Sequence, residues 1–343
     1  MKIQQENILR LRELLAQPGQ RVVILSHTNP DGDAVGSSLA WAELLRTMGH
    51  RVTCIVPNKY PYFLDWMPGI DQVVVFKTDA EGRAAAAIAE ADLIFCLDFN
   101  AVTRLENLTE TLESNTRARR ILIDHHLSPD PHFDLSFSFP ESSSTCFLVY
   151  SIIEALCGVD VITQRMAECL YVGMMTDTGN FAFSFLTPEL FRAVAVLIEK
   201  GLQIPDIHNS VYNAYTEGRA RLFGYAINRK MELIEDGTVA YMSLLESEMR
   251  RFQFQQGDSE GFVNYALTIK KVKMSAMFLA HRKFIRVSLR SRGDVDVNLF
   301  ARRYFNGGGH KNAAGGKSFV SMRETIDHYI RSVREFAEEG HLG

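Results

Sequence analysis

A histidine and two aspartates lie close together in segment 26–34, which reads Ser-His-Thr-Asn-Pro-Asp-Gly-Asp-Ala. Imidazole and carboxylate groups bind divalent metal ions, and His27, Asp31 and Asp33 could direct three such groups at one small volume. The same segment also contains good turn and helix-capping residues. By itself it therefore leaves two interpretations open, a metal site and an ordinary helix start.

Further groups of the same kind occur at three later positions in the chain. Asp98 follows the apolar run 92–97, Asp124 and His125 follow the run 120–123, and Asp177 follows an apolar helical segment. Taken singly, each could be a helix cap, a turn residue or a polar residue at a strand end. Their joint occurrence favours a metal site. The candidate ligands are His27, Asp31, Asp33, Asp98, His125 and Asp177.

The elements that must position these groups follow from the apolar pattern of the first half of the chain. Short apolar runs predict strands at 21–25, 51–56, 72–76, 92–97 and 120–123. Helical patterns lie between and after them, at 35–48, 80–91, 101–115, 145–157 and 163–175. This alternation predicts a parallel sheet, whose carboxyl strand ends lie along one edge and would bring the candidate ligands together.

The pattern changes in the second half of the chain. Helices are predicted at 188–200, 205–234, 246–255, 295–305 and 322–339, strands at 239–244, 275–280 and 284–291, and a glycine-rich turn at 306–310. We therefore expect an α/β protein. A parallel-sheet catalytic domain would span residues 1–187, a helical linker residues 188–216, and a smaller α/β substrate-binding domain residues 217–343.

Composition limits the classes of partner. Over 343 residues the formal net charge is −4, which argues against a large basic surface for long nucleic acid but permits a small anionic substrate. The five cysteines show no Cys-x-x-Cys spacing and are predicted to be free thiols of a reducing compartment. The chain starts with polar residues and has no apolar run of membrane-spanning length, so we expect a cytoplasmic protein without a membrane partner.

The candidate ligands are too many for one ion and suit two. Mixed imidazole and carboxylate donors favour Mn²⁺ over Mg²⁺, which prefers oxygen ligands and water. Two ions about 3.5–4 Å apart can share a hydroxide and hold a phosphoryl group for in-line attack. Because Asp98 ends the strand that we expect to be central, it is the predicted bridging carboxylate.

As an ordered set, these motifs resemble those of the DHH phosphoesterases over nearly the whole chain. The matching segments are Asn29 to Ala34, Asp98, Asp124 to His126 and Asp177 to Gly179, and, for the DHH-associated C-terminal domain, Gly307 to His310 with Ala313 to Gly315. The two-domain form is most similar to the branch of nano-RNases and 3′-phosphoadenosine-5′-phosphate (pAp) phosphatases.

The resemblance implies a role for each matching residue. One metal would be bound by His27, Asp31 and Asp98, and the other by Asp33, Asp98, His125 and Asp177. Asp124 would orient a ligating histidine, and His126 would contact the scissile phosphate or protonate the leaving oxygen. The implied substrate-binding residues are Arg290, Ser291, Gly307, Gly308, Gly309 and His310, with Arg104 as a further candidate for phosphate binding. Residues 142–145 are expected to cap the helix that follows them.

The implied activity is hydrolysis of di- to pentaribonucleotides to 5′-mononucleotides, and of pAp to AMP. The expected cofactors are two Mn²⁺ ions, with Mg²⁺ or Co²⁺ as alternatives, and the expected partners are short RNA oligonucleotides and nucleoside bisphosphates. A homodimer is left open. A dinucleotide phosphodiesterase, a single-strand exonuclease and a non-catalytic nucleotide sensor remain alternatives, whereas Gly307 to His310 argues against a family-II pyrophosphatase.

Overall fold

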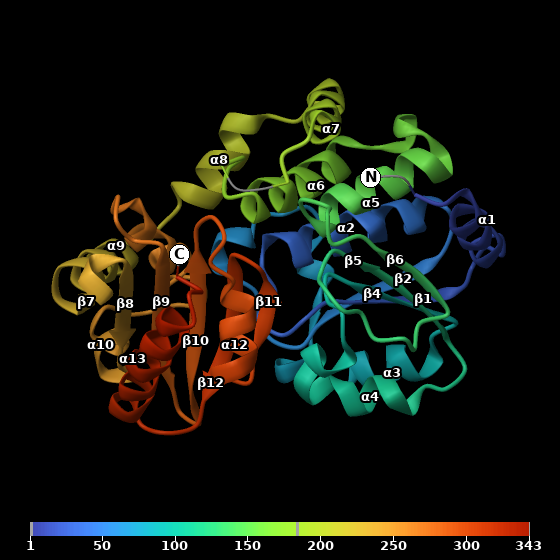
Figure 1. The fold of residues 1–343 in the computed structure, drawn as a ribbon. Coiled ribbons are helices and arrows are strands. Elements are labelled where there is room, and N and C mark those ends of the chain that lie inside the picture. The colour runs from blue at the N-terminus through green and yellow to red at the C-terminus, as the bar shows by residue number, and fades with distance from the viewer. Residues whose placement is uncertain (1–2, 183–184, 343) are drawn as a thin grey trace. The chain divides into compact units, whose positions relative to one another are not determined.

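The computed structural model describes residues 3–182 and 185–342, and the chain divides into two compact units, Met1–Ala214 and Tyr215–Gly343. Each unit contains a sheet covered by helices (Figure 1). The first sheet is wholly parallel and the second is mixed, which confirms the predicted α/β class. Within the described residues, no helix is long and apolar enough to cross a membrane.

The sheet of the first unit has six parallel strands in the order β3-β2-β1-β4-β5-β6. The strands are β1 (Arg21–Leu25), β2 (Arg51–Val56), β3 (Val74–Val75), β4 (Leu93–Leu97), β5 (Arg119–Asp124) and β6 (Leu135–Ser138). Their runs of Val, Ile and Leu are buried on both faces, as in other covered parallel sheets. Because β1 and β4 are neighbours although β2 and β3 lie between them in sequence, the strand order reverses at this pair.

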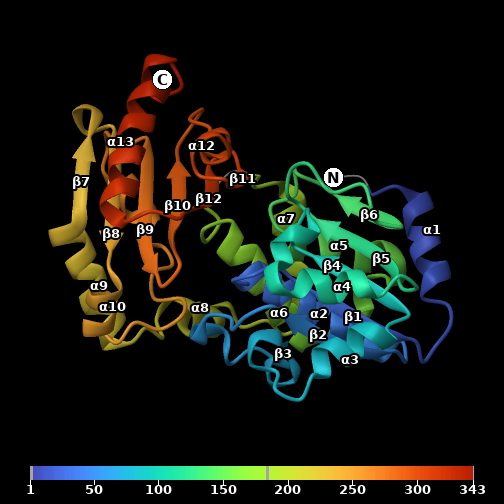
Figure 2. The ribbon, with the colours of Figure 1, turned by 90° about the horizontal axis from the view of Figure 1, so that it is seen from below.

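Helices cover both faces of this sheet (Figures 1 and 2). One face carries α2 (Gly32–Thr47), α5 (Thr145–Cys157) and α6 (Gln164–Asp177). The other carries α3 (Arg83–Glu90), the 3₁₀ segment η4 (Val102–Leu108) and α4 (Thr109–Ser114), whose apolar residues share a core with β1, β4 and β5. The unit also contains α1 (Gln5–Leu14), α7 (Pro188–Glu199) and α8 (Ile204–Tyr212).

Three glycines let α2, α5 and α6 approach one another closely. A methyl group on Gly36 would collide with the backbone carbonyl of Cys169, and one on Gly32 would lie 2.5 Å from Thr176 Oγ1. A methyl group on Gly173 would lie 2.5 Å from Asp33 Oδ1. This close packing brings the last turn of α6, which ends at Asp177, beside the first turn of α2.

The second unit contains a six-stranded sheet in the order β11-β12-β10-β9-β8-β7. Its strands are β7 (Met231–Ile234), β8 (Val239–Leu244), β9 (Met274–His281), β10 (Phe284–Ser291), β11 (Gly308–His310) and β12 (Ala313–Ser318). All neighbouring strands are antiparallel except β8 and β9.

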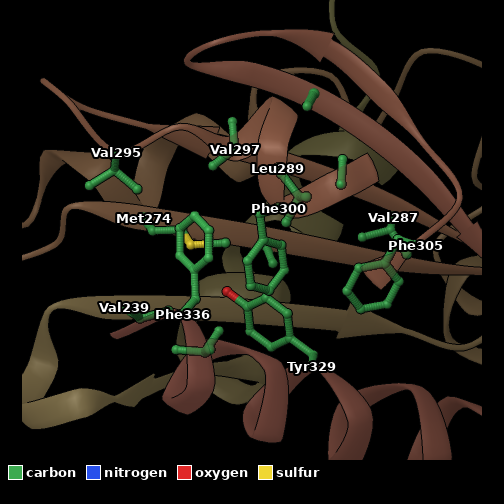
Figure 3. Packing of buried hydrophobic residues seen from close by; sticks show 14 of the residues in the cluster. Val239, Met274, Val287, Leu289, Val295, Val297, Phe300, Phe305, Tyr329 and Phe336 are labelled. Atoms are coloured by element: carbon green, nitrogen blue, oxygen red, sulfur yellow. The ribbon is translucent and has the colours of Figure 1, made fainter. Parts of the chain in front are cut away.

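Each face of the second sheet has its own core. On one face, α12 (Val297–Tyr304) and α13 (Met322–Glu338) pack Phe300, Tyr329 and Phe336 against side chains of β8, β9 and β10 (Figure 3). On the other face, α9 (Glu217–Tyr225), α10 (Glu246–Arg251) and α11 (Phe262–Tyr265) cover mainly β8 and β9. The β10 side chains alternate between half-buried and buried along the strand.

Two predictions for the second half were wrong. The helix expected at 205–234 is instead α8, α9, a π-helical segment (Ala226–Lys230) and β7. It breaks at Thr216, whose side chain caps α9 by accepting from the Arg219 amide, and β7 exists because it pairs with β8. The glycine-rich turn is in part a strand, because Gly308–His310 pairs with β12. Strand β6 was also missed.

Replacing Gly36 by alanine is expected to destabilise the protein by about 1–3 kcal/mol, the usual range for an overpacked core. The added methyl group meets a backbone carbonyl of α6, which cannot rotate away as a side chain could. Urea denaturation followed by circular dichroism would measure the change. Gly224→Ala is the matched control, because that helical glycine has open space around it and alanine should be neutral or stabilising. Equal midpoints for the two variants would contradict the argument.

Candidate metal centre

The candidate ligands come together at the carboxyl ends of β1, β4 and β5. His27 follows β1, Asp98 follows β4, and His125 follows β5. In open α/β sheets, ligands bind outside the carboxyl strand ends where the strand order reverses, which here is between β1 and β4. The fold therefore places the candidate residues at its expected binding site.

Asp98 lies between two histidines at the centre of the cluster. Its Oδ2 is 3.4 Å from His27 Nε2, and its Oδ1 is 3.5 Å from His125 Nε2. The residue is only 2% exposed, and its backbone has a φ of 65°, which a non-glycine residue rarely adopts. One carboxylate oxygen thus faces each histidine, the arrangement needed to connect two adjacent cation sites.

Two groups of potential ligands flank the Asp98 carboxylate. His27, Asp31 and Asp98 offer ligand atoms that lie within 4.8 Å of one another. Asp33, His125 and Asp177 form a second group that meets the same limit, with His125 Nε2 3.4 Å from Asp177 Oδ2 and 3.7 Å from Asp33 Oδ2. Such mixed histidine and carboxylate donors fit divalent ions of borderline softness. The division into two groups is the one that the resemblance implied, and the assignment of an ion to each stays a prediction.

Backbone carbonyls set the orientation of both histidines. His27 Nδ1 lies 2.9 Å from the Thr28 carbonyl oxygen, and His125 Nδ1 lies 3.1 Å from the Ser142 carbonyl oxygen. A carbonyl only accepts hydrogen bonds, so Nδ1 of each ring must carry the proton. Nε2 of each ring therefore faces the carboxylates, where it would offer its lone pair to a metal ion once its own proton has been displaced.

Two helix starts hold the carboxylates of the first turn of α2. Asp31 is the N-cap of α2, and its Oδ1 accepts hydrogen bonds from the amides of Asp33 and Ala34. Asp33 accepts from the amides of Thr145 at 2.6 Å and Cys146 at 2.8 Å, at the start of α5. The positive end of a helix stabilises a buried carboxylate, which explains how Asp33 remains inside the protein.

Thr145 is a residue whose role the sequence did not indicate. Ser144 is the N-cap of α5, in agreement with the predicted capping segment. The hydroxyl of Thr145 instead donates to Asp98 Oδ1 at 2.9 Å, while its amide donates to Asp33. One residue therefore positions carboxylates from two different strand ends. Nothing in the sequence distinguishes this threonine from an ordinary capping residue.

Asp124 orients His126 and not a predicted metal ligand. Asp124 Oδ1 accepts from His126 Nδ1 at 2.7 Å, and Asp124 Oδ2 accepts from the His126 amide at 3.0 Å. His125, the predicted ligand, has its Nδ1 3.1 Å from the Ser142 carbonyl oxygen. The role of Asp124 toward a ligating histidine therefore stays a prediction.

The carboxylates and imidazoles of the cluster strongly shift one another's pKa values. Burial alone would raise the pKa of Asp98, but hydrogen bonds from His125 and His27 hold it well below its ordinary value. Burial opposes the charged form of His125, yet Asp177, Asp98 and Asp33 raise its pKa well above the ordinary value. Burial and the charges of Asp98 and Asp177 raise the pKa of Asp33 well above its ordinary value. Protons thus balance the clustered negative charge, a role that bound cations would take over.

Arg104 and the predicted substrate residues lie in different units. Arg104 is in η4, and its carbonyl accepts from the Thr28 amide beside His27. In the second unit, Arg290 lies opposite Ala313 across β10 and β12, and His310 lies opposite Ala313 across β11 and β12. Arg290 and His310 therefore share one face of that sheet.

Other predicted substrate residues have structural roles within the second unit. The Ser291 hydroxyl donates to the Val295 carbonyl at 2.6 Å and accepts from Asn312 Nδ2. A methyl group on Gly307 would collide with the backbone of β12, and one on Gly309 would lie 2.5 Å from the Ala313 carbonyl oxygen. These glycines are needed for strand packing, whether or not they also approach a ligand.

Family models match both units of the chain. The model of the DHH family, N-terminal domain, matches residues 21–174, and the model of the DHHA1 domain matches residues 236–339. The chain belongs to the DHH family. It is therefore a hydrolase of the phosphoesterase type, as predicted, and it resembles the expected branch of that family.

Relatives of similar length support this placement. An exopolyphosphatase-related protein from Bacteroides fragilis has a solved structure that is 38% identical, covers 97% of each chain, and superposes with a TM-score of 0.90. The bifunctional oligoribonuclease and PAP phosphatase NrnA of Thermus thermophilus is 26% identical over 96% of this chain and 94% of its own. The protein of the same name from Bacillus subtilis is 25% identical over 87% and 89%.

Substitution of Asp98 by asparagine is expected to weaken divalent-metal binding by at least about 100-fold, because even residues that only support metal ligands contribute 10–100-fold. Hydrolysis should fall in parallel. Isothermal titration with Mn²⁺ would measure the affinity. Asp92→Asn is the matched control, since Asp92 lies at the opposite end of β4 and pairs with Arg21 at the surface. An unchanged affinity in the Asp98 variant would exclude it as a ligand.

Substitution of Thr145 by valine is expected to reduce Mn²⁺ affinity by about 10–100-fold, because the Asp98 carboxylate loses the hydroxyl that holds it. Valine keeps the shape of threonine and the amide that donates to Asp33. Thr145→Ser keeps the hydroxyl and should restore most of the affinity, which a purely steric role would not predict. Titration calorimetry of both variants, with circular dichroism to monitor folding, would separate the two explanations.

Proposed function

We propose that this DHH-family protein hydrolyses short oligoribonucleotides to 5′-mononucleotides and pAp to AMP. The single observation that carries the metal-dependent chemistry is the buried Asp98 carboxylate, which lies between two histidine and carboxylate groups. The substrate class rests on the relatives from T. thermophilus and B. subtilis, which bear the name of a bifunctional oligoribonuclease and PAP phosphatase.

In this proposal, Asp98 would be a ligand shared by two divalent ions, for which we expect Mn²⁺. His27 and Asp31 would complete one site, while Asp33, His125 and Asp177 would complete the other. When bound, the ions would supply an activated water and neutralise charge on the phosphoryl group. The chain itself keeps both histidines in the ligating tautomer and holds the carboxylates through two helix starts.

His126 is our candidate for the proton donor to the leaving oxygen. Asp124 binds its Nδ1, which makes Nε2 the ring nitrogen that exchanges a proton with the substrate. The proton would move from Nε2 to the leaving oxygen as the phosphorus–oxygen bond breaks, while the hydrogen bond to Asp124 holds the ring in position. Arg104, at the edge of the metal centre, would contact a phosphate.

The second unit is proposed to hold the rest of the substrate. Arg290 and His310 lie on one sheet face, where a guanidinium and an imidazole could bind a phosphate or a base edge. The amide of Gly309 donates to Asn298 Oδ1 at 2.9 Å. This bond fixes the backbone that carries His310.

Hydrolysis of several substrates by the Mn²⁺-loaded protein, measured side by side, would test the proposal. The set consists of pAp, the dinucleotide pGpG, a labelled 24-mer RNA, pyrophosphate and a linear polyphosphate. We expect turnover of pAp and the dinucleotide, with little activity on the others. Preference for the 24-mer would favour an exonuclease, and binding of metal and nucleotide without turnover would favour a sensor.

A second candidate function is hydrolysis of polyphosphate. The B. fragilis protein is named as exopolyphosphatase-related and shares 38% of its residues with this chain. Polyphosphate has no base or ribose, so it would use the metal centre without specific contacts to a nucleoside. Dominant turnover of polyphosphate in the same experiment would replace our proposal with this one.

His310→Ala is expected to raise KM for the dinucleotide about 10-fold, the loss of one hydrogen bond to a charged group. The kcat should change little, because His310 would hold bound substrate and not the reacting atoms. Steady-state kinetics would measure both constants. A fall in kcat with unchanged KM would instead place His310 in the chemical step.

A further inference from the structure

One face of the second sheet carries cationic side chains well beyond Arg290. Along β10, Ile285, Val287 and Leu289 point into the core beneath α12 and α13. The alternate residues Phe284, Arg286, Ser288 and Arg290 lie on the opposite face and are half-buried. This arrangement follows from the two-residue period of a strand. This face of β10 thus carries basic and polar side chains, whereas the other face contributes apolar side chains to the core.

The register between strands arranges this face in rows. Arg286 lies directly opposite Lys317, and Arg290 lies opposite Ala313, which in turn lies opposite His310. Between these two rows lies a third, of Ser288, Gly315 and Gly308. Two cationic rows therefore flank a floor of small residues. Among the described residues that the pairing of β9 to β12 places on this face, none is acidic.

The Arg286–Lys317 row is too far from the Arg290–His310 row to bind the same phosphate. The two arginines are four residues apart on one strand, a separation of about 13 Å. A phosphate bound between Arg286 and Lys317 would contact a guanidinium and an ammonium group at once.

Aromatic rings adjoin the Arg286–Lys317 row. Lys317 Nζ lies 5.1 Å from the centre of the Phe284 ring, and His281 stacks on Phe284 with their ring centres 5.0 Å apart. Phe319 comes directly after β12, is 70% exposed, and has its ring centre 6.5 Å from that of Phe284. Exposed aromatic rings beside cationic side chains are typical of sites that bind single-stranded nucleic acid, because the rings stack on bases.

We propose that Arg286 and Lys317 form a second phosphate site for an oligonucleotide substrate, and that Phe319 stacks on the adjoining base. The proposal rests on the oligonucleotide activity proposed above. This site would bind a phosphodiester group other than the one bound at the Arg290–His310 row. It would therefore contribute to binding of a pentanucleotide but not of pAp or a dinucleotide, which are too short to extend from one cationic row to the other.

The double variant Arg286→Gln/Lys317→Gln tests the site. For a 5′-phosphorylated pentaribonucleotide, we expect KM to rise at least 10-fold, with kcat unchanged. For pAp and pGpG, both constants should stay within about two-fold of the wild type. Loss of one phosphate contact should also reduce the slope of log affinity against log salt by about 0.7 for the pentanucleotide. Phe319→Ala should weaken pentanucleotide binding in the same selective way.

The matched control is Arg334→Gln, because Arg334 lies on α13, which covers the opposite face of the sheet, and pairs with Glu235. It should leave all three substrates unaffected.

Fluorescence anisotropy of a labelled pentaribonucleotide, without turnover, distinguishes this inference from the proposed function. Weaker binding by the double variant supports the site even if the wild type hydrolyses no oligonucleotide. Equal binding by wild type and double variant overturns the site even if hydrolysis is confirmed. An equal loss for pAp and the pentanucleotide would also overturn it, because the residues would then act at the cleaved phosphate.

Discussion

The metal centre depends on the burial of several carboxylates beside one another. Removing charged groups from water has a large free-energy cost. Asp33 and Asp98 are almost completely buried, and Asp177 lies close to both through His125. The protein offsets this cost with two imidazole rings, the amides at the start of α5, and the Thr145 hydroxyl. Divalent cations would complete the compensation. The same interactions that stabilise the buried carboxylates also orient them for binding a metal ion.

Helix packing is the second requirement for this arrangement. Asp177 is the last residue of α6, so its position is set by how α6 lies against α2. Gly36 and Gly173 allow that approach, and a larger residue at either position would push α6 away from the ligands of the first turn of α2. The glycines of α2 and α6 thus serve the chemistry without containing a reactive group. A larger residue at Gly36 or Gly173 would move the candidate ligands apart without changing any of the ligands themselves.

The glycine-rich segment of the second unit has a structural role that its sequence did not indicate. Residues 306–310 were predicted to form a turn, yet Gly308–His310 is an edge strand whose glycines meet the backbone of β12. That strand places His310 in the same row as Arg290. The sheet face that they share continues to Arg286 and Lys317, so the antiparallel strands β10 to β12 present basic side chains at two separate places.

The sequence alone determined the α/β class, the strands β1, β2, β4, β5, β8, β9 and β10, and the six candidate metal ligands. Apolar runs, and the histidines and acidic residues near them, are local features of the sequence. Only the tertiary structure decided which groups meet. No local sequence pattern specifies that Asp98 lies between His27 and His125. The same is true of the hydrogen bond from Thr145 to Asp98 and of the pairing of Asp124 with His126. Strands β7 and β11 likewise depend on pairing with β8 and β12, which overrides the local preference for helix or turn.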